Sequence, residues 1–219
     1  MSPRAAGVGA TAAAGIATAA DLLLLWVTNA RRPELGLTAP PAAALVAGSV
    51  LGVLAIPLYG LGYWQVATGL PSGRAARTVV LLGAATGVIG AALHGLTGVV
   101  LRDELRAGAA AADPLAVIAR HGRLLVPLWG LGIGCAVAAA ALYAHLVLAG
   151  ESAWPRWMAA VNPVVLSCVL GALAAPSGVL RAFLLPAAPN LANAIFFGLT
   201  VAVRRDRDRT LTAERSRRT

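Results

Sequence analysis

Six long apolar stretches, separated by short segments rich in arginine, proline and glycine, dominate the chain. They cover residues 6–30, 41–69, 78–101, 124–149, 157–175 and 179–203. A helix needs ~20 apolar residues to cross the hydrocarbon core of a bilayer. The pattern therefore predicts an all-α fold, a polytopic membrane helix bundle with about six transmembrane helices. We expect residues 1–203 to form this single bundle and residues 204–219 to form a basic, disordered cytoplasmic tail.

Composition agrees with a membrane protein and argues against a nucleic-acid partner. Of the 219 residues, 58% are hydrophobic and 12% are charged, and the mean hydropathy is +0.76. The net charge is +9, and all of the positively charged side chains are arginines. These arginines lie in the loops and in the tail, as expected for cytoplasmic flanks of membrane helices. An even number of spans with a basic tail places both termini in the cytoplasm. The apolar start resembles a signal peptide, but it continues through Trp26, so we interpret it as the first span.

Asp21 is the most informative residue, because it lies inside the first apolar stretch, "ATAADLLLLW". A charged side chain near the middle of a membrane helix costs roughly 2.5 to 3.5 kcal/mol on insertion scales. Asp21 can lower this cost by staying protonated or by bonding to His94. Either arrangement gives a site that can hold a proton. The structural alternative is that Asp21 only ties helices together by hydrogen bonding.

The heights of other polar residues can be estimated from a rise of ~1.5 Å per residue in spans of alternating direction. His94, Trp129 and Asn190 come out in the same layer as Asp21. A second layer, nearer the cytoplasm, holds several more polar and aromatic side chains. Its members are Tyr59, Tyr63, Trp64, Gln65, Tyr143, Asn162 and Asn193. We expect the two layers to be the ends of one cavity.

Glycine and proline spacing indicates which helices approach closely and which are distorted. Gly83, Gly87, Gly90 and Gly98 recur on the helical face that also carries His94. Such stripes of small residues allow close helix contacts in membranes, so His94 is predicted to point into the bundle. Prolines at positions 57, 127, 163, 186 and 189 lie inside the spans and are predicted to distort them.

The sequence offers no pattern typical of a metal or cofactor site. The two cysteines and three histidines lack ligand spacing, and the chain has no Gly-rich phosphate loop and no acidic cluster for magnesium. We expect no cofactor and no metal. The expected partners are membrane lipids and a lipophilic small molecule, and the oligomeric state is left open.

Five segments carry a resemblance to an uncharacterised family of small six-span bacterial membrane proteins. They are "ADLLLLW", "GVLAIPLYGLGYWQ", "LHGLTG", "WPRWMAAVNPVVLS" and "PNLANAIFFGLT". The resemblance covers most of the chain and implies a multi-pass protein of the bacterial cytoplasmic (inner) membrane. A weaker resemblance is to the small integral-membrane terpene cyclases, which protonate an alkene or epoxide with an intramembrane acid.

The hypothesis that follows is a membrane-embedded enzyme that cyclises an isoprenoid by acid initiation. Asp21 is its predicted general acid, and either His94 or Asn190 is predicted to hold the carboxyl group in the donating orientation. The predicted substrate-binding residues are Tyr59, Tyr63, Trp64, Trp129, Asn162, Asn190 and Asn193. The alternatives are a small proton-linked transporter, in which Asp21 and His94 load and release a proton, and a lipid-binding membrane protein.

Overall fold

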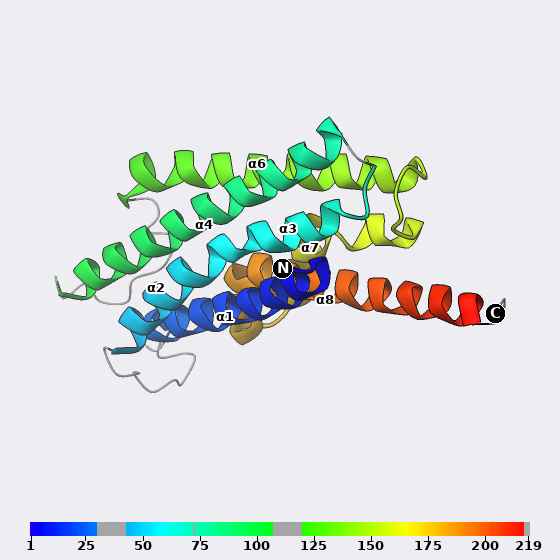
Figure 1. Cartoon of the computed structure of the whole chain (residues 1–219). Helices are drawn as coiled ribbons and strands as arrows, with labels where there is room; N and C mark the ends of the chain where they lie inside the picture. The colour runs from blue at the N-terminus through cyan, green and yellow to red at the C-terminus, as the bar shows by residue number, and fades with distance from the viewer. Residues whose placement is uncertain (30–42, 72, 107–119, 217–219) are drawn as a thin grey trace.

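The computed structural model describes residues 1–29, 43–71, 73–106 and 120–216, and its regular elements are all helical (Figure 1). The first half contains α1 (Pro3–Asn29), α2 (Ala43–Ala55), the short 3-10 helix η2 (Ile56–Leu58), α3 (Tyr59–Ala67) and α4 (Arg74–Arg106). The second half contains α6 (Gly122–Leu148), the 3-10 helix η3 (Arg156–Val161), α7 (Pro163–Ala174) and α8 (Gly178–Ser216).

Five helical stretches are long and apolar enough to cross a membrane, and the predicted all-α membrane fold is confirmed. They are Pro3–Trp26, Ala43–Ala67, Arg74–Asp103, Gly122–Leu148 and Gly178–Arg205. The second stretch joins α2, η2 and α3, with Pro57 in the 3-10 turn between them. The protein is therefore a helical membrane protein.

The fifth predicted span, residues 157–175, is broken into two pieces. Only η3 and the 12-residue α7 form there, and α7 has a length of about 18 Å, well below the ~30 Å hydrocarbon core. The break falls at Asn162, whose backbone is extended with φ −66° and ψ 160°. Pro163, which follows, has no N–H to lose at the first helical position, so it starts a new helix there.

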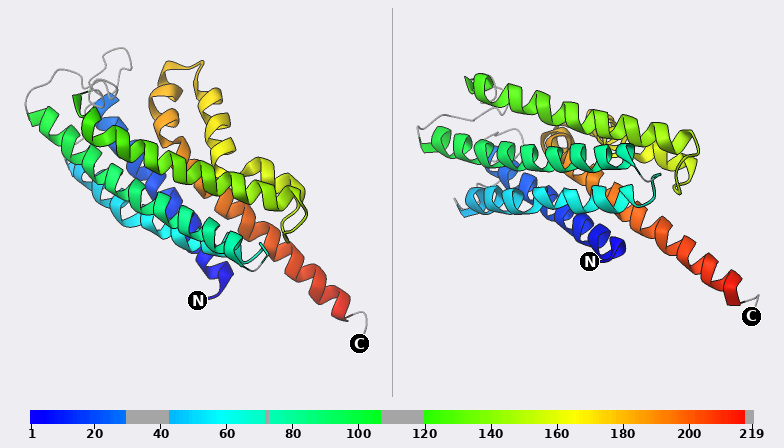
Figure 2. Two further views of the ribbon diagram at one scale, coloured as in Figure 1. Left: turned by 90° about the horizontal axis from the view of Figure 1, so that it is seen from above. Right: turned by 45° about the horizontal axis from the view of Figure 1, so that its top comes forward.

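The helices form a layered bundle in which α8 closes against the first helix (Figure 1). α1 packs along α8, α2 and α3, while α4 packs on α2 and α3 and in turn supports α6. α7 packs on α8 and contacts α6 and η3. Figure 2 shows that α7 and the first part of α8 lean away from the other helices as a hairpin. α8 then continues beyond the bundle as a helix to Ser216, in the region for which the sequence predicted a disordered tail.

The predicted glycine stripe of α4 lies against α2, η2 and α3. A Cβ atom at Gly83 would overlap the Tyr63 ring, and one at Gly87 would lie 2.9 Å from the Ile56 carbonyl oxygen. These positions therefore need glycine for the helices to reach their observed separation. The same close packing turns His94, which is 7% exposed, into the bundle, as predicted.

Candidate functional site

The Asp21 carboxylate lies inside the bundle and contacts side chains from two other helices. Its Oδ1 atom is 3.3 Å from Nδ1 of His94 on α4, and its Oδ2 atom accepts a 2.6 Å hydrogen bond from Nδ2 of Asn190 on α8. The side chain of Asp21 is 15% exposed and that of His94 is 6% exposed. The predicted convergence of Asp21, His94 and Asn190 in one layer is confirmed.

His94 is held from its other side by the backbone of α2. Its Nε2 atom is 2.9 Å from the carbonyl oxygen of Gly48. A carbonyl oxygen only accepts hydrogen bonds, so Nε2 carries a proton when this bond forms. The ring can come so near because Gly52, one turn further along α2, has no side chain, and a Cβ atom there would overlap the ring. Gly48 and Gly52 thus fix the tautomer and the place of the imidazole.

These bonds determine how many protons Asp21 and His94 hold between them. With Nε2 already protonated, a hydrogen bond between Nδ1 and Oδ1 needs one more proton. That proton resides either on the carboxyl group, facing a neutral imidazole, or on Nδ1, facing a carboxylate. Both arrangements leave the pair with zero net charge. The pair therefore shares one proton inside an apolar bundle, which lowers the cost of burying the acid.

The same chain of bonds continues from Asn190 to Tyr59. The Tyr59 hydroxyl donates a 2.6 Å hydrogen bond to Oδ1 of Asn190, whose amide nitrogen is bound to Asp21. We call these four side chains, together with the Gly48 carbonyl, the Asp21 network. It joins α1, α2, α3, α4 and α8. Tyr59, which the sequence placed in the second layer, belongs to this first one.

Of the other residues predicted for the second layer, Tyr63 and Asn193 face each other inside the bundle, whereas Asn162 lies at the start of α7. The Tyr63 hydroxyl points to Oδ1 of Asn193, 3.5 Å away, and both side chains are buried. Asn162 is also buried, but its Oδ1 atom accepts hydrogen bonds from the backbone N–H groups of Val164 and Val165. Asn162 therefore caps the N-terminus of α7 instead of extending the polar layer.

Trp64 and Trp129, the two tryptophans predicted to lie in the polar layers, do not contact the Asp21 network. Trp64 is 37% exposed and Trp129 is 40% exposed, so both indoles reach the outer surface of the bundle. Trp129 lies on α6, which packs against α4, η3 and α7, whereas Asp21 lies on α1. Their predicted place on the wall of a central cavity was wrong, because height along a helix does not fix the direction of a side chain around it. Phe197, which the sequence prediction missed, packs edge-on against Tyr59 and Tyr63 instead.

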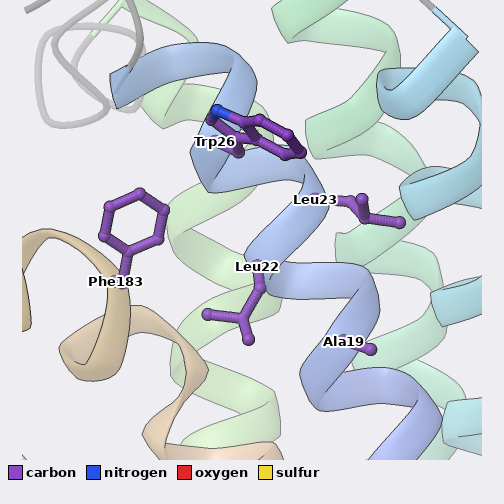
Figure 3. Close-up of a pocket in the computed structure, with 5 residues that line it drawn as sticks. All are labelled: Ala19, Leu22, Leu23, Trp26 and Phe183. Carbon is purple, nitrogen blue, oxygen red and sulfur yellow. The ribbon is translucent and has the colours of Figure 1, made fainter. Parts of the chain in front are cut away.

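An apolar groove lies beside α1, on the side away from the Asp21 network. Its volume is about 470 Å³, it opens to the surface, and it is lined by Ala19, Leu22, Leu23, Trp26 and Phe183. Figure 3 shows Leu22 and Trp26 of α1 facing Phe183 of α8 across it. At 3.6 residues per turn, Asp21 projects about 150° around α1 from the middle of the groove. The groove and the carboxyl group are therefore on opposite faces of the helix.

The described residues contain no group of three or more His, Cys, Asp or Glu side chains that could hold a metal ion. The chemistry that the Asp21 network can perform with its own atoms is the binding, sharing and release of a proton.

The chain belongs to a family of unknown function, DUF6796, which matches residues 5–205. No curated protein and no solved structure matches the chain. The match covers all five membrane-spanning stretches except the first residues of the first one.

Proposed function

We propose that the protein is a small proton-linked membrane carrier in which Asp21 and His94 load and release a proton. The observation that supports this most directly is the 3.3 Å contact between Oδ1 of Asp21 and Nδ1 of His94, whose Nε2 is bound to the Gly48 carbonyl, because this arrangement requires one proton between the two groups. If the side chain at position 21 served only to connect helices by hydrogen bonds, an amide could take the place of the acid. A pair with one mobile proton can also change its charge.

The charge of the pair explains how proton release would be coupled to transport. With its proton, the pair is neutral and suits the apolar bundle. Without it, the pair has a charge of −1, which is costly at this depth. Release is therefore favoured only when a cation arrives or when the site opens to water. α8, with Pro186 and Pro189 shortly before Asn190, is the helix best suited to make such an opening.

We place this carrier in the cytoplasmic membrane of a bacterium, with both termini in the cytoplasm. The arginine-rich end of α8 supports this orientation. In this proposal, η3 and the short α7 bring the chain back between α6 and α8 as a sixth, broken passage.

Asp21→Asn separates proton binding from structure. With Nε2–H of His94 bound to Gly48, the ring atom Nδ1 can accept a hydrogen bond from the new amide group. The new amide oxygen can still accept the bond from Asn190. Every hydrogen bond of the Asp21 network is thus kept, while the shared proton is lost.

The test is proton uptake into proteoliposomes that contain a pH-sensitive dye, driven by a potassium gradient with valinomycin and repeated with sodium or tetraphenylphosphonium inside. We expect wild type to acidify the lumen faster than protein-free liposomes, and Asp21→Asn to fall to the protein-free rate. Asp103→Asn is the matched control, because that carboxylate is 63% exposed at the end of a span. Wild-type flux in Asp21→Asn, or no flux above protein-free liposomes with any ion, would refute the carrier.

A second candidate is the enzyme that cyclises an isoprenoid, and the apolar groove favours it. Its size and its aromatic residues Trp26 and Phe183 suit a lipophilic chain. Asp21 would donate a proton to a double bond or epoxide, and the cyclised cation would later return a proton. For this, the substrate has to pass from the groove to the other face of α1. Turnover of an isoprenoid in detergent that is lost in Asp21→Asn would favour the enzyme over the carrier. Binding without turnover or flux would indicate a lipid-binding protein.

A further inference from the structure

Four pairs of side chains connect α3 with α8 between the Asp21 network and one end of the bundle. We call this end the terminal face, since α1 begins there and α3 ends there (Figure 1), and Arg204 of α8 bonds to Thr68, the residue that follows α3. Gly7 of α1 lies near both Gln65 and Val201, which shows that these three helices reach the terminal face side by side. The pairs are Tyr59 with Asn190, Tyr63 with Asn193, Gln65 with Thr200, and Thr68 with Arg204.

These pairs follow one another along the two helices, as the rungs of one polar ladder, because the two helices run in the same direction. On each helix the four members follow one another at intervals of two to seven residues, in the same order. Oγ1 of Thr200 lies 2.8 Å from Oε1 of Gln65 and 2.7 Å from the carbonyl oxygen of Phe197, so its one proton can be donated to either oxygen. Arg204 donates to the hydroxyl of Thr68. From Asn190 to Arg204 the ladder rises by about 21 Å, enough to lead from the network to the membrane surface.

Within this ladder, the side-chain amide nitrogen of Gln65 is a buried donor without a partner among the described residues. The side chain is fully buried, and its Nε2 atom has no acceptor among the residues that the structure describes. A buried donor without a partner is unfavourable, and such groups in native proteins are commonly bound to internal water. Next along the ladder, the ring of Phe197 packs on Gly62 and edge-on against Tyr63. Phe197 therefore separates the outer two pairs from the inner two.

The opposite end of the bundle has a different character. Beyond the Asp21 network, the described side chains of Leu24, Ala44, Leu45, Val100 and Leu101 form an apolar cluster. Leu24 follows Asp21 by one helical turn, and Leu45 precedes Gly48 by one turn. An apolar cluster opposes proton passage, whereas hydroxyl and amide groups with water allow it. Among the residues that the structure describes, the paired polar side chains therefore lead from the network toward the terminal face.

We propose that protons reach Asp21 and His94 from the terminal face along this ladder, and that Gln65 positions a water molecule within it. This inference rests on the proposed loading of a proton by the pair. Water molecules and the hydroxyl groups of Thr200, Tyr63 and Tyr59 each accept one proton and give up another, so none of them changes. The amide groups of Asn190 and Asn193 do not relay protons, so water beside Asn190 carries the proton from the Tyr59 hydroxyl to the pair. The pair is the final acceptor. The Phe197 ring interrupts this proton path, and movement of the ring opens the path.

The three histidines of the chain, His94, His121 and His145, make the exchange of a single ring proton measurable. In protein labelled with ¹⁵N-histidine and placed in lipid nanodiscs, the His94 ring N–H exchange rate with water is measured by NMR. We expect Gln65→Leu and Thr200→Val to slow this exchange about tenfold, with the His94 chemical shift unchanged. Tyr143→Phe is the control, because its hydroxyl is buried without a partner in the described part of the chain but lies on α6, outside the ladder.

Phe197→Leu should change the His94 ring N–H exchange rate in the opposite direction. Loss of the ring should accelerate exchange about tenfold, while Phe196→Leu, which alters the neighbouring ring packed on Tyr143, should not. Wild-type exchange in both Gln65→Leu and Thr200→Val, or slower exchange in Phe197→Leu, overturns the path. These outcomes are distinct from failure of the carrier. Flux that needs Asp21 with unaltered exchange refutes only the path, and altered exchange without flux refutes only the carrier.

Discussion

Gly52→Ala should destabilise the protein by displacing His94, although alanine favours a helix more than glycine does. The added methyl carbon would lie 2.6 Å from Cγ of the imidazole and would overlap Cδ2 and Nε2. Ordinary contacts of a Cβ atom begin at 3.4 Å. The ring therefore has to retreat, and the bond from Nε2 to the Gly48 carbonyl, now 2.9 Å, is stretched or lost.

Three terms set the size of this effect. Overpacking of a filled interior costs about 1–3 kcal/mol, and a side-chain hydrogen bond between membrane helices contributes about 0.6 kcal/mol on average. The higher helix propensity of alanine than of glycine offsets about 0.5–1 kcal/mol of this cost. Overpacking dominates, so we expect a net loss of about 1–3 kcal/mol. The measurement is reversible unfolding in mixed micelles, with the His94 ¹⁵N shift as a readout of the ring.

Gly60→Ala is the matched control on the same face of the α2–α3 span. A methyl group there meets Ala84 at 3.6 Å, an ordinary contact, so this variant should be as stable as wild type or slightly more stable. In a His94→Ala background the obstacle is gone, and Gly52→Ala should lose most of its cost. If Gly52→Ala is as stable as Gly60→Ala and leaves the His94 signal in place, the close approach of ring and backbone is refuted.

Two further substitutions test single hydrogen bonds by the same unfolding assay. Tyr59→Phe removes the donor to Asn190 and should cost about 1 kcal/mol, and an unchanged midpoint would mean that this bond adds nothing. Asn162→Ala removes the acceptor for the N–H groups of Val164 and Val165 and should cost about 1 kcal/mol. Hydrogen exchange should then rise in the first turn of α7, whereas Asn162→Asp should keep the protection, and equal exchange in all three proteins would contradict the cap.

The layer around Asp21 could be predicted because height in a membrane helix follows from residue number alone. Counting from the middle of each span brought together Asp21, His94 and Asn190. For His94 the glycine stripe also gave the direction, since small residues mark the face of a close helix contact. For Trp64 and Trp129 no such marker was present. Their heights alone could not distinguish a side chain inside the bundle from one on its surface.

The break in the fifth apolar stretch occurs at a local sequence signal that average hydropathy does not detect. Residues 157–175 are apolar enough to suggest a continuous helix, but Asn162 followed by Pro163 is a favourable start for a new one. The ladder between α3 and α8 was also hidden. Thr200 and Arg204 are ordinary residues in the sequence, and only the parallel course of the two helices places them opposite Gln65 and Thr68.

The closed hydrogen-bond arrangement of the Asp21 network is itself an argument for a mobile proton. Moving the proton between Oδ1 of Asp21 and Nδ1 of His94 breaks no bond to Asn190 or to Gly48, so the two forms differ mainly in the position of charge. Small changes in the surrounding field then decide which form is favoured. The Tyr59 hydroxyl and the Asn190 amide stabilise a negative carboxylate, and both depend on where α8 lies against α3. A shift of α8 would therefore move these donors relative to the carboxyl group and would change which of the two forms its surroundings favour, as a proton-linked carrier requires.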